Sequence, residues 1–127
     1  MTITLTETNR QRRGHRFLPP ERGLTRIPAL YATEDIAVED KTIWAHYFAG
    51  GCDWYVAELD PASGRAFGYV NLGIDADAEW GLFSLAFLEP LIVPQGVIIG
   101  AQRITVPLVI ERDCEWVPRP WRDVRPL

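Results

Sequence analysis

The sequence predicts an α+β fold that is mainly an antiparallel β-sheet, arranged as a meander with one or two short helices. Three observations lead to this fold class. Segments rich in β-branched and aromatic residues recur along the chain. Turn signals built from Gly, Pro and Asp separate these segments. A helix-starting signal stands among them at Ser84, and residues 30–35 suit either a short helical turn or a loop.

The first two strands are expected at residues 42–48 and 54–59. Residues 42–48 contain no Gly or Pro, and both sets of alternating positions are largely apolar. That pattern suits a strand that is covered on both sides, or an edge strand near an interface. In the second strand, the two-residue period places Trp54, Val56 and Glu58 on one face.

A hairpin and a fourth strand follow in the sequence. Residues 60–64, which read DPASG, form a turn signal, because Pro presets φ and Gly supplies the left-handed position. Residues 66–72 are expected to form the third strand and to pair with the second. An acidic loop at 73–78 then leads to a fourth strand at 80–85.

The rest of the predicted domain contains a short helix and more β structure. Ser84 has a side chain suited to cap a helix over residues 85–89. The tripeptide at 94–96, Pro-Gln-Gly, predicts another turn. Residues 97–99 and 104–110 are β-like in composition.

Composition and length organise the chain into three segments. Residues 1–26 are expected to be a basic, flexible arm, residues 27–117 a single globular domain, and residues 118–127 a tail whose Pro and Trp residues pack on the domain. A chain of 127 residues that is 47% hydrophobic and 24% charged is not a disordered protein. No apolar run approaches the roughly 20 residues that span a bilayer. The N-terminus lacks the apolar stretch of a secretory signal, so we expect a cytoplasmic protein with no membrane partner.

The net charge of −4 is divided unevenly along the chain. Residues 1–26 carry six arginines against two glutamates, or +4, whereas residues 27–127 carry −8. The basic arm can dock on its own acidic body, bind nucleic-acid phosphates, or stay a solvated terminus. In the nucleic-acid interpretation, the residues that contact phosphates are Arg10, Arg12, Arg13 and Arg16.

Aromatic residues suggest a second surface for nucleic acid. Aromatic side chains on an exposed sheet face stack bases, at about 1–3 kcal/mol per base. Trp54 and Tyr69 are bordered by polar residues, so we expect them to be the exposed pair. The remaining aromatic residues of the predicted strands are expected in the core; they are Trp44, Tyr47, Tyr55, Phe67, Trp80 and Phe83.

A set of acidic residues suggests an enzymatic alternative. Carboxylates that converge on a divalent metal can support phosphodiester hydrolysis. However, no carboxylate-x-Lys pattern follows the acids, and Asp60 is explained by the turn that it begins. We therefore expect no catalytic residues, metal or cofactor. The alternative, a metal-dependent phosphodiesterase or nuclease, uses Glu58, Asp60, Glu79, Glu111 and Asp113.

The acidic surface supports two further interpretations. Eleven acidic residues lie between Glu34 and Glu89, against Lys41 and Arg65 alone. Such a surface can mimic nucleic acid and occupy a basic groove on a host protein, or it can simply aid solubility. A structural or assembly protein is another class, because an edge strand such as the one holding Pro107 can pair between subunits. The sequence leaves the oligomeric state open.

Five segments between residues 27 and 117 form a pattern: IPALYATED at 27–35, DWYVAELDP at 53–61, AFGYV at 66–70, EWGLFSL at 79–85 and IERD at 110–113. In order and spacing they resemble domain of unknown function number 2958. Members of that family are small proteins, or parts of larger ones, encoded largely by bacterial mobile elements, plasmids and phages. The resemblance implies such an origin and implies no activity. Around Pro90 this sequence departs from the polar helix of the family.

We therefore predict a non-enzymatic binding protein of a phage or mobile element. Its expected partner is nucleic acid or a host protein that handles nucleic acid. The sheet, the acidic surface and the basic arm are the surfaces expected to make the contacts. The phosphodiesterase and the assembly protein remain the alternatives.

Overall fold

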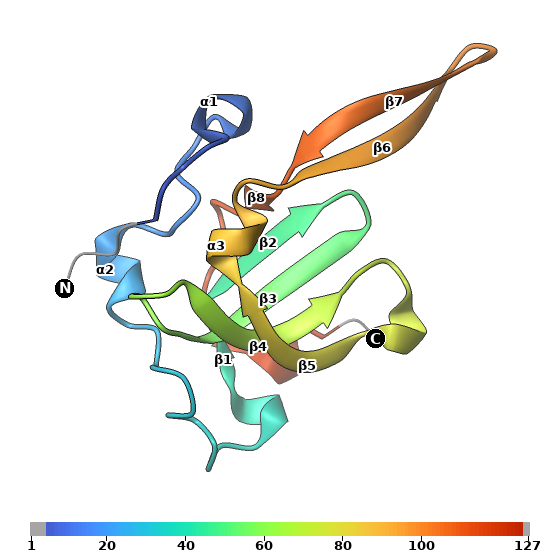
Figure 1. Ribbon diagram of the computed structural model, residues 1–127. Coiled ribbons are helices and arrows are strands. Elements are labelled where there is room, and N and C mark those ends of the chain that lie inside the picture. Colours follow the sequence, from blue (N-terminus) through green and yellow to red (C-terminus); the bar gives the residue numbers. More distant parts are fainter. Residues whose placement is uncertain (1–4, 126–127) are drawn as a thin grey trace.

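The structure is a computed structural model that describes residues 5–125. The start of the predicted arm, residues 1–4, and the end of the predicted tail, residues 126–127, lie outside the described residues. The chain has the predicted α+β fold, dominated by antiparallel strands (Figure 1). Its helices are α1 (Arg10–Arg13), α2 (Glu21–Leu24) and α3 (Leu85–Leu88), with 3-10 turns η1 (Val38–Asp40), η2 (Asp75–Asp77) and η3 (Trp121–Asp123). Its strands are β1 (Thr42–Ile43), β2 (Ala45–Ala49), β3 (Cys52–Leu59), β4 (Arg65–Asn71), β5 (Glu79–Ser84), β6 (Ile92–Ile99), β7 (Gln102–Val109), β8 (Glu111–Arg112) and β9 (Arg119–Pro120).

A five-stranded antiparallel sheet in the order β5-β4-β3-β2-β8 forms the centre of the molecule. Strands β2 to β5 follow one another as the predicted meander. The strands expected at 54–59, 66–72 and 80–85 correspond to β3, β4 and β5. The single strand expected at 42–48 is instead two strands that part at Trp44, because β1 pairs with β9 near the C-terminus.

A β-bulge in β3 changes which side chains share a face. Pairing with β4 shifts between Val56 and Glu58. Leu59 therefore packs with Trp54 and Val56 in one core, whereas Ala57 joins the core on the opposite face. The predicted grouping of Trp54, Val56 and Glu58 is wrong at Glu58, because the extra residue of a bulge interrupts the two-residue period.

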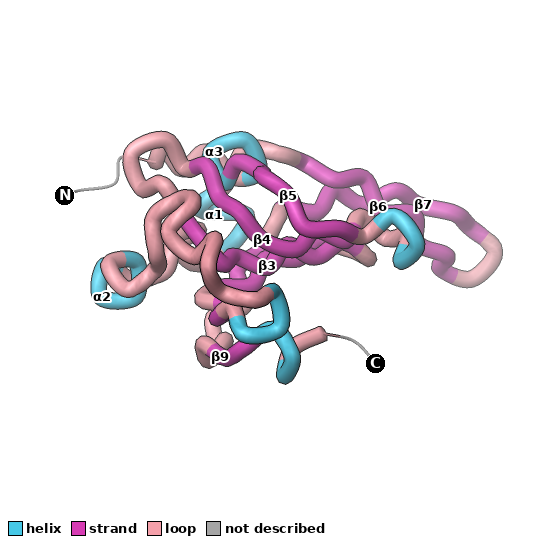
Figure 2. Tube along the Cα trace, turned by 90° about the horizontal axis from the view of Figure 1, so that it is seen from below, coloured by secondary structure: helices cyan, strands magenta, loops and turns pink. Residues whose placement is uncertain are grey.

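Two hydrophobic cores cover the two faces of this sheet. On one face, the N-terminal segment and α3 supply Phe17 and Leu85. On the other face, the C-terminal segment supplies Trp121, which packs with Ile43 and Ala57. Figure 2 shows α3 and β9 on opposite sides of the strands. Both ends of the described chain therefore contribute to the packing of the sheet.

The predicted helix after the fourth strand is confirmed as α3. The Oγ atom of Ser84 accepts a hydrogen bond from the backbone N–H of Phe87 at 3.1 Å, which caps the helix N-terminus. Among residues 5–125, no helix combines the length and the apolar character needed to cross a bilayer.

The turn predicted at residues 94–96 is wrong, because these residues lie inside β6. Pro94 is directly opposite Pro107 of β7, and the ladder continues past both residues. The chain turns instead between Ile99 and Gln102, which are paired. Gly100 has φ 63° at the first central position of this two-residue turn, as type II′ geometry requires.

Candidate functional site

A protruding hairpin exposes apolar side chains to solvent. This hairpin, residues 92–109, joins β6 to β7 in a separate two-stranded sheet and is called the ribbon below. It extends well beyond the five-stranded sheet (Figures 1 and 2). Only one of its eighteen residues, Arg103, is charged. At its tip, Ile98 is 71% exposed and Ile99 is 61% exposed.

The abundance of β-branched residues explains why residues 92–109 form strands. Two strands without a covering layer are at best marginally stable in water. One face of the ribbon is apolar at most positions, so a covering partner would remove that face from water. The pairs on this face, from root to tip, are Val93 with Leu108, Gln95 with Val106, Val97 with Ile104, and Ile99 with Gln102.

Two prolines restrict how the ribbon can be extended. Pro94 and Pro107 lie opposite each other in the ladder. Proline has no backbone N–H, so the two residues fit a pair that exchanges no hydrogen bonds across the ribbon. In such a pair the backbone groups point outward, and both outer edges therefore lack a donor at mid-length. The ribbon is a poor template for another strand at either edge.

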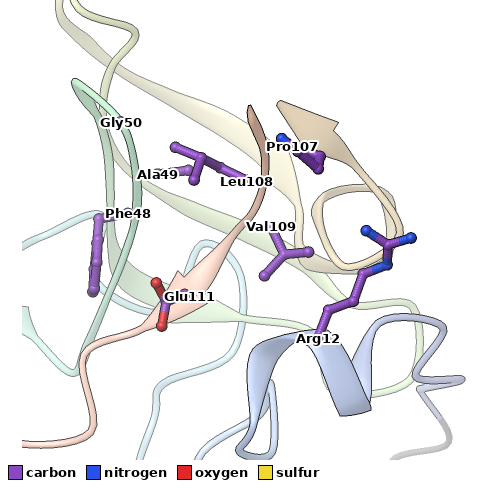
Figure 3. A pocket seen from close by; sticks show the side chains of 8 residues that line it. All are labelled: Arg12, Phe48, Ala49, Gly50, Pro107, Leu108, Val109 and Glu111. Carbon is purple, nitrogen blue, oxygen red and sulfur yellow. The ribbon is translucent and has the colours of Figure 1, made fainter. Parts of the chain in front are cut away.

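A pocket of about 380 Å³ lies at the root of the ribbon (Figure 3). Its lining joins Phe48 and Gly50, at the end of β2, to Leu108 of the ribbon. Arg12 of α1 and Glu111 of β8 add one positive and one negative side chain. The N-terminal segment, the sheet and the ribbon therefore meet at this pocket.

A second cavity, of about 590 Å³, follows β5 from the β4–β5 connection to α3 and Leu91, and is called the apolar groove below. Its volume falls within the range of binding sites, roughly 300–1,000 Å³. Asp77 and Glu79 are the charged residues among those that line it. The lining also contains apolar side chains that are at least 45% exposed: Leu72, Ile74, Leu82 and Phe87.

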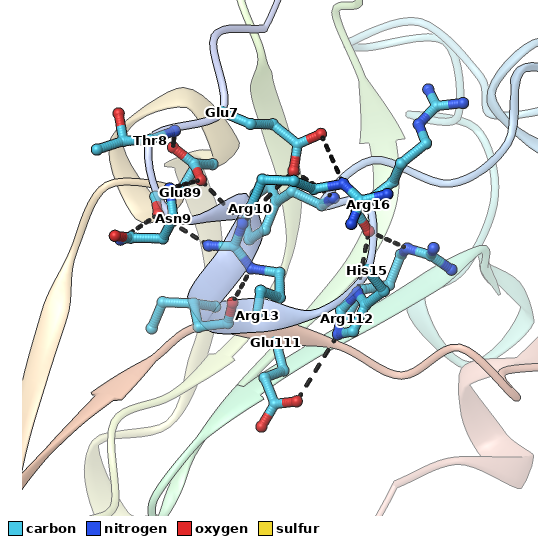
Figure 4. Close-up of polar contacts among 12 residues, drawn as sticks. Glu7, Thr8, Asn9, Arg10, Arg13, His15, Arg16, Glu89, Glu111 and Arg112 are labelled. Atoms are coloured by element: carbon cyan, nitrogen blue, oxygen red, sulfur yellow. Dashed lines mark hydrogen bonds and ion pairs between the residues drawn. The ribbon is translucent and has the colours of Figure 1, made fainter.

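The N-terminal segment is attached to the body by a buried ion pair (Figure 4). Arg13 Nη1 lies 2.8 Å from Glu89 Oε2, and neither side chain is accessible to solvent. Arg13 also donates from Nε to the carbonyl of Ile110 at 2.7 Å. The backbone N–H groups of Thr8 and Asn9 donate to the same Glu89 carboxylate, at 2.7 and 2.9 Å. The pair is thus fully hydrogen-bonded, as a buried charge requires.

These contacts change the acidity of Glu89. Burial alone would raise the pKa of its carboxyl group. The hydrogen bonds from Arg13, Asn9 and Thr8 outweigh burial and lower the pKa below its usual value. Glu89 is therefore held as a carboxylate.

Residues 5–26 form a segment that is docked on the body, and not the flexible arm that the sequence predicts. Phe17 is fully buried, and the hydroxyl of Tyr47 donates to its carbonyl at 2.8 Å. The Arg13 guanidinium lies 4.5 Å from the centre of the Phe17 ring. Docking on the chain's own body is the interpretation that these residues show. The segment docks because Arg13 pairs with Glu89, a buried anion on the body. The composition of the arm does not reveal where that anion lies.

The four arginines proposed to contact phosphates have different surroundings. Arg13 is buried and is not available to a ligand. Arg10, Arg12 and Arg16 are exposed, although Arg10 Nε lies 3.9 Å from a Glu7 carboxylate oxygen. The structure therefore brings three of the four to the surface of one folded segment.

The predicted base-stacking pair is not a pair. Trp54 is only 6% exposed and belongs to the core beneath the N-terminal segment. Tyr69 lies on the opposite face of the sheet, where its ring centre is 4.5 Å from that of Trp121. Trp54 is buried because its face of the sheet is covered by a core that contains Phe17 of the N-terminal segment and Leu85 and Leu88 of α3. Its polar neighbours in sequence give no sign of this cover.

The five acidic residues of the phosphodiesterase alternative do not converge. Among residues 5–125, no cluster of three or more His, Cys, Asp or Glu side chains could hold a metal ion. Glu58 is buried and accepts hydrogen bonds from the N–H groups of Tyr31 and Thr33 and from the Thr33 hydroxyl. It holds Tyr31 at φ 68°, an uncommon backbone conformation for this residue type. Lys41 donates to Thr33 on the same loop.

The other four acidic residues lie in four different surroundings. Asp60 Oδ1 accepts from the N–H of Ala62, as expected for a turn residue. Glu79 is exposed at the start of β5. Glu111 Oε1 lies 3.7 Å from His15 Nε2. Asp113 contacts a different histidine, His46.

His46 forms a polar group that sequence reasoning missed. Its Nε2 lies 2.7 Å from Asp53 Oδ1, and its Nδ1 lies 3.5 Å from Asp113 Oδ2. The ring stacks on Tyr55 with a centroid distance of 4.6 Å. Burial raises the pKa of the Tyr55 hydroxyl, and the Asp53 carboxylate raises it further. Asp113 is 67 positions from His46, so no local motif marks the group.

The sequence suggests pairing between subunits at the strand that holds Pro107, but it does not predict an exposed apolar hairpin at residues 92–109. The sequence nevertheless contains a signal for this hairpin, which is two alternating apolar runs around a Gly-Ala turn with a single charge.

The comparisons with known proteins add no relative: no family model, no curated protein and no solved structure matches this chain.

Proposed function

We propose that this chain is a non-enzymatic binding protein that docks on another protein through the ribbon. The observation that carries the proposal is the ribbon itself, an uncovered two-stranded element with one charge in eighteen residues. Exposed apolar patches of this kind are typical of protein–protein contacts. Nucleic acid is a poor match for this surface, because phosphate binding requires several positive side chains.

Photo-crosslinking in the cells that naturally carry the gene tests the proposal. A photoreactive benzoylphenylalanine replaces Ile98 at the ribbon tip in one strain. In a control strain it replaces Ala62, which is exposed on the β3–β4 turn. We expect discrete protein adducts from position 98 and none from position 62. Equal labelling from both positions, or no protein adduct from position 98, would contradict the proposal.

A second candidate is contact with nucleic acid through the docked N-terminal segment. The supporting observation is that the Arg13–Glu89 pair fixes α1, with Arg10 and Arg12 exposed on it. Fixed cations lose less entropy on binding phosphates than cations on a disordered arm. The partner in this second candidate is nucleic acid, whereas the partner in the first is a protein. The proposed origin in a phage or mobile element rests on the family resemblance alone.

Fluorescence anisotropy with labelled single- and double-stranded oligonucleotides tests this second candidate. A variant with Arg10, Arg12 and Arg16 changed to Gln should lose binding that weakens with salt. The matched control changes Arg22, Arg26 and Arg65, which are also exposed, and should retain the binding. Equal loss in both variants would point to net charge and would contradict a specific surface.

A further inference from the structure

We propose that the ribbon tip of one copy of this chain occupies the apolar groove of a second copy, and that two copies exchange this contact reciprocally. The inference rests on the proposed function, because it identifies the ribbon's protein partner as a second copy. The surfaces involved are the tip, residues 98–103, and the apolar groove along β5.

The tip and the groove are matched in polarity. Ile98 and Ile99 expose 71% and 61% of their surface at the tip. The groove exposes four large apolar side chains of its own. Seating the tip would remove both sets from water together, which is the main driving force in most protein association.

The tip and the groove are also matched in charge. Arg103, the only charged residue of the ribbon, pairs with Ile98 across the ladder. Of the described residues that line the groove, the charged ones are Asp77 and Glu79, and both are acidic. A seated tip therefore brings its one cation to a groove whose charges are negative, a complementarity that favours this orientation.

The length of the ribbon excludes the chain's own tip as the occupant of its groove. Leu91 lines one end of the groove and immediately precedes β6, so that end of the groove lies at the root of the ribbon. The strand β6 has eight residues, which places the tip about 26 Å from the root, at about 3.3 Å per residue. The chain's own tip therefore cannot reach its own groove.

Antiparallel alignment of two ribbons satisfies both contacts at once. The distance from root to tip is the same in both copies, so each tip reaches the root of the other ribbon. The result is a closed two-fold dimer rather than an open filament. The low charge of the ribbon lets the two copies lie together although each chain carries −4. Pro94 and Pro107 disfavour the competing edge-to-edge pairing.

Sedimentation velocity of the full chain across a range of concentrations tests the inference. We expect a monomer–dimer equilibrium in the unmodified chain. Arg103→Glu should weaken dimerisation by about tenfold or more, because it places like charges at the groove. The Asp77→Lys/Glu79→Lys variant should weaken it similarly. Arg22→Glu, the same change at an exposed arginine on α2, should leave it unchanged.

Combining the tip and groove changes in one chain should restore dimerisation, since both copies then carry both reversed charges. Circular dichroism checks that each variant is folded. A monomer at every concentration, a dimer unaffected by Arg103→Glu, or no rescue would overturn the inference. If the chain is monomeric but crosslinks from position 98 to a different protein, the proposed function stands and the inference fails. If no protein adduct forms at position 98, the proposed function fails as well.

Discussion

At the scale of single residues, a buried pair of opposite charges connects two distant parts of the chain. Arg13 and Glu89 are 76 positions apart and neither is exposed to solvent. Removing one partner of such a pair is costly, because the other charge stays buried without compensation. The pair therefore determines whether the N-terminal segment remains docked.

Replacement of Glu89 should reveal this role. We expect Glu89→Gln to lower the free energy of unfolding by about 3–5 kcal/mol, because Arg13 would remain buried beside a neutral group. The matched control is Glu39→Gln at an exposed position of η1, which should change stability by less than about 0.5 kcal/mol. Urea denaturation at neutral pH measures both variants. Equal stabilities would show that the ion pair is not needed for docking.

The same pair predicts a dependence of stability on pH. The pKa of Glu89 is lower in the folded chain than its ordinary value of 4.5. The unfolded chain therefore binds the proton more readily, and acid favours unfolding. The stabilisation is present above pH 4.5 and is lost as the pH falls through the folded-state pKa. Glu89→Gln should lose less stability than the unmodified chain between neutral and acidic pH; parallel curves would contradict this assignment.

Individual residues also show which features of the structure can be predicted from the sequence and which cannot. Ser84 was recognised as a helix cap because its hydrogen-bond partner lies three residues away. The partner of Arg13 is distant in sequence, so no local pattern announces it. Trp54 was expected to be exposed because its neighbours are polar, but tertiary packing determines burial.

At the scale of elements, β3 and β4 approach each other closely at one glycine. A Cβ atom on Gly68 would lie 1.6 Å from the backbone oxygen of Tyr55, which is a severe overlap. Its partner across the β4–β5 ladder, Gly81, has nothing within 4 Å of the same position. The two glycines therefore form a natural comparison.

Gly68→Ala should strongly destabilise the chain, since backbone must move to admit the methyl group. Gly81→Ala should be neutral or slightly stabilising, because alanine restricts the unfolded chain more than glycine does. Thermal unfolding of the two variants measures the difference. Similar melting temperatures would mean that β3 and β4 do not approach each other at Gly68 as closely as the structure shows.

The elements also show which parts of the fold a sequence can predict. The meander followed from turn residues and β-branched runs, both of which are local signals. The bulge, the break at Trp44 and the extension of β6 through Pro94 depend on which strand lies opposite. Those pairings join residues that are not neighbours in sequence. The local Pro-Gln-Gly pattern therefore predicts a turn at residues 94–96, where the β6–β7 ladder continues.

At the scale of the whole molecule, both ends of the described chain cover the central sheet. The N-terminal segment supplies Phe17 and Leu18 to one core, and the C-terminal segment supplies Trp121 to the other. Residues 27–117 thus pack against both the segment before them and the segment after them. We infer that the chain folds as one unit.

A shortened chain that begins at Ile27 tests whether the chain folds as one unit. It would lose Phe17, which alone contributes about 1.5–3 kcal/mol, and would leave Glu89 buried without Arg13. Since small domains are stable by about 5–15 kcal/mol, we expect the shortened chain to be largely unfolded at room temperature. Far-UV circular dichroism and urea titration measure this. A cooperative transition with unchanged midpoint would refute the structural role of the N-terminal segment.

The measurement that most directly tests the central claim, that the ribbon is a docking element, is amide hydrogen exchange at two protein concentrations. In dilute solution, ribbon amides at residues 97–104 should exchange faster than those of β3, because a two-stranded hairpin without a covering layer is marginally stable. At high concentration, where the ribbon docks on a second copy, the same amides should slow while β3 is unchanged. Ribbon amides as slow as those of β3 in dilute solution would contradict the account, and rates independent of concentration would contradict docking on a second copy.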